Sequence, residues 1–149
     1  MNPAAQMERL ARLHRQMLGL ARAGLDLIGR GELEAWEDVC VQRRRLQRQA
    51  QAVGLGLRPL WADWQAGLAR LAAADPDQAR RLAELLAEIG RTGGQVLALD
   101  HRAAQALQAQ MEAAREQIVR LEQGSRLGRA YGQALRPAAS QPLQLSRTG

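Results

Sequence analysis

Aromatic residues, lysine and cysteine are scarce or absent in this chain of 149 residues. Phe is missing, Tyr131 is the single tyrosine, and all three Trp lie in the first half. One cysteine, Cys40, cannot form an intramolecular disulfide, which suits a reducing compartment. β-Branched residues are also few, whereas the strong helix formers Ala, Leu, Arg, Gln and Glu dominate. The composition therefore predicts an all-α protein of one domain.

Long apolar segments are absent as well. No run approaches the roughly 18 residues that suggest a membrane span, and the N-terminus "MNPAAQMERLARLHRQ" has no signal-peptide core. We expect a cytoplasmic protein without membrane insertion. The net charge of +6 permits binding to nucleic acid or anionic lipid, but 15 acidic residues are interleaved with the arginines.

Helix-start signals divide the chain into long helices joined by short turns, as in an antiparallel, coiled-coil-like bundle. Asn2 and Pro3 fit an N-cap and a first helical residue, and "GRG" at 29–31 fits a turn between antiparallel helices. Pro59 can open a short helix that carries Trp61 and Trp64 on one face. Whether this helix is separate or continues the one before it stays open.

The strongest start signal is "DPDQ" at 75–78. Asp75 is expected to be the N-cap, Pro76 the first helical residue, and Gln78 the N3 partner of a capping box. Apolar residues continue on both sides of Gly90, Gly93 and Gly94, which favours a bent but continuous helix.

The last helical stretch has a heptad pattern of apolar residues. Five of its residues share one face and form the predicted client-binding groove: Leu107, Met111, Ala114, Ile118 and Leu121. Such a seam can close against the protein's own helices, a second copy, or an amphipathic helix from a partner. The pattern stops at Gly124, so we expect a helical domain over 1–124 and a flexible, disordered segment over 125–149.

Catalysis and metal binding have little support in the sequence. His14 and His101 stand on separate helices without further ligands at metal spacing. Cys40 falls on a predicted inner face and lacks an apparent base, so packing is its expected role. We therefore expect no catalytic, cofactor-binding or metal-binding residue, no cofactor, and no enzymatic activity.

Two stretches superficially suggest phosphate or nucleic-acid binding. "GRTGG" at 90–94 lacks the spacing, the lysine and the preceding strand of a phosphate-binding loop. The arginines of "RRRLQRQ" at 43–49 spread around more than half a helical turn, without aromatic neighbours for base stacking. A solvated helix face is the favoured interpretation, and no nucleic-acid partner is expected.

Two stretches resemble the flagellar export chaperones of the FlgN and FliT type. "GLDLIGRGELEAWEDVCVQRRRLQRQ" is similar to their early segment, and "GRAYGQAL" before a polar tail is similar to the FlgN ending. The resemblance implies a cytoplasmic, non-enzymatic chaperone of type III protein export. It would bind the C-terminal helical segment of hook-filament junction proteins, prevent their premature assembly and deliver them to the export gate.

The resemblance also implies a role for Tyr131 and Gly132, namely docking on the cytoplasmic domain of the export gate. From the residues alone, Tyr131 could equally fold back on the end of the bundle. Alternatives to the FlgN type are a FliT-like chaperone of the filament cap protein, or a structural coiled-coil or nucleic-acid-associated protein. Monomer and dimer both stay open.

Overall fold

A computed structural model describes residues 2–135 of the chain, and all regular structure within that range is α-helical. The expected all-α fold is confirmed. Five helices follow in order: α1 (Pro3–Gly29), α2 (Leu33–Gly56), α3 (Arg58–Ala62), α4 (Trp64–Ala74) and α5 (Pro76–Leu135). They belong to two compact units, residues 1–107 and 108–149. The boundary between the units falls within α5.

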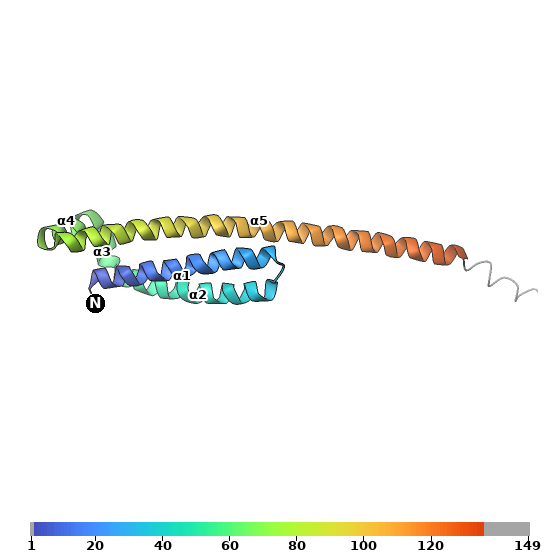
Figure 1. Ribbon diagram of the computed structural model, residues 1–149, viewed down its shortest axis with the longest axis horizontal. Coiled ribbons are helices and arrows are strands. Elements are labelled where there is room, and N and C mark those ends of the chain that lie inside the picture. Colours follow the sequence, from blue (N-terminus) through green and yellow to red (C-terminus); the bar gives the residue numbers. More distant parts are fainter. Residues whose placement is uncertain (1, 136–149) are drawn as a thin grey trace, which may run out of the picture. The chain divides into compact units, whose positions relative to one another are not determined.

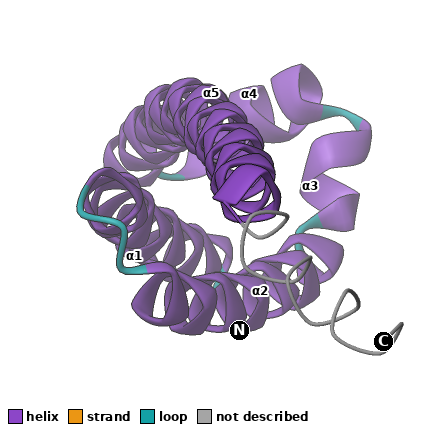
Figure 2. Ribbon diagram, turned by 90° about the vertical axis from the view of Figure 1, so that its right-hand side faces the viewer, coloured by secondary structure: helices purple, strands orange, loops and turns teal. Residues whose placement is uncertain are grey.

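In the first unit, α1 and α2 form an antiparallel hairpin, and the first part of α5 runs beside both helices (Figures 1 and 2). The turn at 30–31 places Gly31 at φ +73, a left-handed conformation that a residue without Cβ adopts at little cost. Gly24 of α1 faces Trp36 and Val39 of α2, whose side chains an added Cβ would meet at 3.5 Å, an ordinary van der Waals contact. The predicted "GRG" turn is therefore confirmed.

Two predicted helix starts are confirmed in detail. The Asn2 side chain accepts a hydrogen bond from the Ala4 N–H at 3.0 Å, and the Asp75 carboxylate accepts one from the Gln78 N–H at 3.1 Å. The Gln78 side chain does not complete a capping box. Its amide instead donates to the Asn2 Oδ1 at 2.7 Å, so it ties the start of α5 to the start of α1.

The main core lies where the start of α1, the end of α2 and the start of α5 meet, and α3 and α4 pack against it. Its buried side chains come from the three long helices and from the cap residue that follows α2, Leu57: Met7, Leu10, Ala11, Leu13, Val53, Leu57, Leu82 and Leu85. Leu60, Trp61, Trp64, Leu68 and Leu71 cover this core from the short helices. Burial of this kind, at roughly 25 cal/mol per Å² of apolar surface, is the dominant stabilising term.

The short helices differ from the single helix expected after Pro59. Asp63 leaves the helical region at φ −147, ψ 77 and its carboxylate accepts from the Ala66 N–H, so Asp63 caps a new helix. Trp61 and Trp64 therefore belong to different helices. Their rings nevertheless stack, with centroids 5.5 Å apart.

Helix α5 continues through both glycine-containing stretches. No break occurs at 90–94, so the expected continuity of the helix is confirmed, while the expected bend stays a prediction. The helix also passes Gly124 and ends at Leu135, so the expected helix end at Gly124 is wrong. A helical glycine costs only about 1 kcal/mol relative to Ala, and the Leu, Arg and Ala residues around it are good helix formers. The rest of the expected flexible segment, residues 136–149, lies outside the described residues.

Candidate partner-binding surfaces

The second unit presents a continuous apolar face to solvent. We define the C-terminal seam as Met111, Ala114, Ile118 and Leu121, the four predicted groove residues in this unit. All four are exposed, and the exposed fractions of the large ones are 57% for Met111, 55% for Ile118 and 66% for Leu121. The fifth predicted residue, Leu107, is half-buried at the end of the first unit.

Further along the same helix, Leu127, Tyr131 and Leu135 follow at intervals of four residues and are also exposed. Tyr131 itself is 69% exposed. Gly132 lies within α5 in a helical conformation. Tyr131 is therefore presented from a helix surface.

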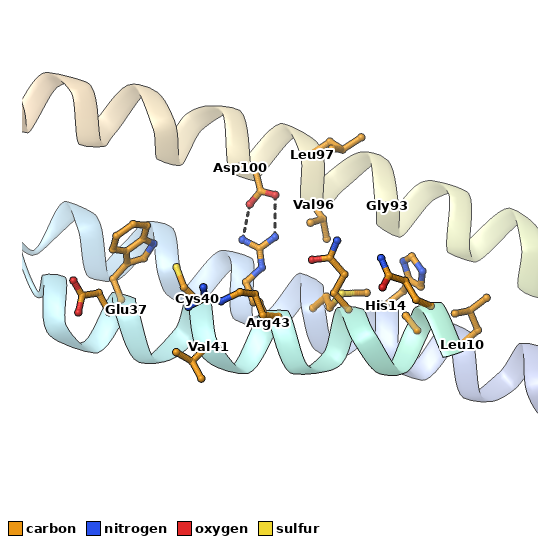
Figure 3. Close-up of a pocket in the computed structure, with 16 residues that line it drawn as sticks. Leu10, His14, Glu37, Cys40, Val41, Arg43, Gly93, Val96, Leu97 and Asp100 are labelled. Atoms are coloured by element: carbon orange, nitrogen blue, oxygen red, sulfur yellow. Dashed lines mark hydrogen bonds and ion pairs between the residues drawn. The ribbon is translucent and has the colours of Figure 1, made fainter. Parts of the chain in front are cut away.

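A second surface is an open groove of about 1100 Å³ in the first unit, between α1, α2 and α5 (Figure 3). Its walls are mostly apolar, with Leu10 and Met17 from α1, Trp36 and Cys40 from α2, and Val96 from α5. Cys40, which the sequence predicts to lie on an inner face, lines this groove together with Trp36. Both are half-buried at the groove, and Val53 is the only buried residue of α2.

An ion pair crosses this groove. Figure 3 shows the Arg43 guanidinium and the Asp100 carboxylate facing one another, joined by two hydrogen bonds of 2.7 and 2.9 Å. The hydrogen bonds to Asp100 raise the pKa of Arg43 above its usual value, although partial burial opposes the shift. The pair therefore holds α2 and α5 in register with a bidentate contact.

One arginine of the "RRRLQRQ" stretch forms this ion pair, and the other three are exposed to solvent. Arg43 points inward to Asp100, whereas Arg44, Arg45 and Arg48 are exposed. Two further arginines pair across helices, Arg15 with Glu88 and Arg81 with Glu8. Three arginines of the first unit, Arg15, Arg43 and Arg81, are thus paired with a carboxylate on another helix.

His14 lines the same groove and is half-buried. The pKa of His14 lies below its ordinary value of 6.5 because burial disfavours the charged ring. As the pH falls below 6.5, the His14 ring is protonated in the unfolded chain before it is protonated in the folded chain. The free energy of unfolding therefore decreases until the pH reaches the folded-state pKa of His14.

We expect the urea midpoint of unfolding to fall as the pH is lowered from about 7 to about 5. His14→Gln should remove the part of this fall that stems from the imidazole, because an amide does not titrate in that window. Equal pH dependence in the variant and the wild type would show that His14 has the same pKa folded and unfolded.

The other residues considered for catalysis, metal binding or phosphate binding do not form a site within the described part of the chain. Among residues 2–135, no three His, Cys, Asp or Glu side chains are placed to hold a metal ion. His101 lies on α5 beside Gln105, and the "GRTGG" stretch is an uninterrupted part of the same helix. Thr92 within it is buried and its hydroxyl donates to the Glu88 carbonyl at 2.8 Å.

Comparison with known proteins yields no relative. No protein-family model, no curated protein and no solved structure matches this chain. Within the described residues, no helix combines the length and the apolar character that crossing a membrane requires. The exposed face of residues 108–135 is the feature of this molecule that most needs a functional explanation.

Proposed function

We propose that this protein binds an amphipathic helix of a partner along the C-terminal seam. The observation that carries the proposal is the exposure of Met111, Ile118 and Leu121 to between 55% and 66% on one helix face. Exposed apolar surface of this kind marks sites of protein–protein interaction. The apolar residues of the seam recur every seven positions, and helices with this repeat pack against a second helix.

The chemistry of the seam suits a helical client. Met111 is flexible and polarisable, so it adapts to side chains of different shape. Ala114 lets a second helix approach closely between the larger residues. A helix of the length of residues 108–135 spans about 42 Å at 1.5 Å per residue, enough for several turns of a client.

The biological role proposed for this activity is that of a non-enzymatic cytoplasmic chaperone of flagellar type III export, similar to FlgN. Its clients would be the C-terminal segments of hook-filament junction proteins, whose apolar helices it would keep from assembling early. Tyr131 would then dock on the cytoplasmic domain of the export gate. The sequence resemblance and the exposed seam support this proposal; a FliT-like chaperone of the filament cap protein is the nearest alternative.

A nucleic-acid-associated helical protein is the competing class. The pairing of Arg43 with Asp100 disfavours it, because it removes the first arginine of the 43–49 stretch from any free basic surface. A nucleic-acid ligand would need several free cations along one surface, together with exposed aromatic rings if the strand is single.

Calorimetry at two salt concentrations distinguishes the two classes. We expect the affinity for a junction-protein C-terminal peptide to change by less than about threefold between roughly 50 and 200 mM salt, with a negative heat-capacity change from apolar burial. An oligonucleotide of mixed sequence should bind weakly at the higher salt. Tight oligonucleotide binding that falls by about a hundredfold or more over this range, without peptide binding, would contradict the proposal.

A further inference from the structure

The C-terminal seam changes character along the helix. The large residues Met111, Ile118 and Leu121 occupy its first half. One further seven-residue step from Ile118 reaches Ser125, and one from Leu121 reaches Gly128, both of them exposed. A Cβ at Gly128 would meet no atom within 4 Å, so the seam offers an open notch there. The first half of this face thus carries large side chains, and the second half, at Ser125 and Gly128, has room for a large side chain from another helix.

We infer that residues 108–131 pair with the same residues of a second copy of this chain, in antiparallel orientation. With the two-fold axis between positions 119 and 120, Ile118 of each copy faces Leu121 of the other. Met111 then faces Gly128, and Ala114 faces Ser125. Met111 of each copy thus fills the space beside Gly128 of the other, so each end of the pairing holds one large side chain opposite a residue without a side chain.

The charges beside the seam match in the same register. Arg115 and Glu122 flank the central layers on one side, and antiparallel pairing brings Arg115 of each copy next to Glu122 of the other. Within the described residues, neither side chain forms an ion pair, whereas the nearby Glu116 and Arg120 pair with one another at 3.9 Å. The two-fold symmetry makes two such intermolecular pairs.

A parallel arrangement satisfies neither condition. Gly128 would then face Gly128, leaving a void in the seam, and Met111 would face Met111. The flanking Arg115 and Glu122 would each lie beside a glutamine, Gln110 or Gln117, in place of an opposite charge. Shape and charge therefore both favour the antiparallel second copy as the occupant of this face. The inference concerns the free protein and requires no client, so it goes beyond the proposed chaperone function.

Sedimentation equilibrium of the full-length protein from about 1 to 500 μM measures this self-association. Arg115→Glu and Glu122→Arg should each weaken the dimer by about tenfold, since both symmetric attractions become repulsions. The double variant with both changes should regain wild-type affinity. Arg120→Glu, which lies away from the seam, is the matched control and should leave the dimer unchanged. Circular dichroism of all four variants should match the wild type.

Disulfide formation tests the orientation, in a Cys40→Ser background. Met111→Cys alone should form no disulfide dimer, because antiparallel pairing holds the two copies of position 111 about 25 Å apart along the axis. A mixture of Met111→Cys and Gly128→Cys chains should form the mixed disulfide. A protein that stays monomeric throughout, a dimer that ignores the charge reversals, or rapid cross-linking of Met111→Cys to itself would overturn the inference.

Discussion

Replacing Ile118 with Asp is expected to lower the affinity for a client helix by at least about a hundredfold, equivalent to about 2.8 kcal/mol at 1.4 kcal/mol per tenfold change. The substitution removes an apolar side chain from the centre of the C-terminal seam and places a carboxylate against the apolar face of the client. Burying an unpaired charge there costs more than the lost contact itself. Calorimetry with a junction-protein peptide measures the effect.

Val119→Asp is the matched control for this experiment. Val119 is 50% exposed, close to the 55% of Ile118, but the next residue of a helix points about 100° away from the seam. Both variants should keep the wild-type melting temperature within about two degrees, since neither side chain is buried in the described fold. Equal loss of binding in the two variants, or unaltered binding in both, would place the client elsewhere.

Tyr131→Ala is expected to weaken binding to the cytoplasmic domain of the export gate by about thirtyfold, roughly 2 kcal/mol, and to slow export of the client. The ring is 69% exposed, and an exposed tyrosine offers a large apolar surface while losing few rotamers on binding. Because nothing in the described fold relies on this ring, thermal stability and client affinity should stay near wild type.

Tyr131→Phe separates the ring from the hydroxyl. It should retain most of the gate affinity if the ring provides the contact, and it should resemble Tyr131→Ala if a hydrogen bond from the hydroxyl dominates. A fall of several degrees in the melting temperature of Tyr131→Ala would show that the tyrosine belongs to the fold. Unchanged affinity for the gate domain in both variants would show that Tyr131 takes no part in the proposed docking on the export gate.

Local signals in the sequence predicted most of the helix boundaries correctly. Asn2 and Asp75 are caps whose short side chains bond the backbone one turn ahead, and this interaction depends on residues close in sequence. Gly31 likewise takes a conformation that its own chemistry favours. Such features are readable from sequence because no distant part of the chain is needed to form them.

Features that depend on distant residues were not predictable in the same way. Gln78 could bond its own N-cap or another helix, and it takes Asn2, 76 positions away in the chain. The Arg43–Asp100 pair was not anticipated, although an acidic residue within the apolar pattern around Val96 and Leu99 is a signal that could have indicated an inward-facing partner. Both contacts depend on the register between helices.

The extent of α5 shows a different limit of pattern reasoning. The heptad repeat of large residues ends before Gly124, which predicts a helix end there. The helix instead continues to Leu135 on backbone propensity, with Gly128 and Gly132 at seam positions. At Gly124 the change in pattern therefore marks a change in the residues on the helix face and not the end of the helix.

Hydrogen–deuterium exchange with and without a client peptide tests the central claim most directly. At a low, fixed protein concentration, amides of residues 108–135 should exchange quickly in the free chain, because the second unit has few tertiary contacts to suppress local opening. The account predicts that the peptide slows exchange in α5 around Met111, Ile118 and Leu121. Protection confined to the groove in the first unit, around Trp36, Cys40 and Val96, or no protection anywhere, would contradict it.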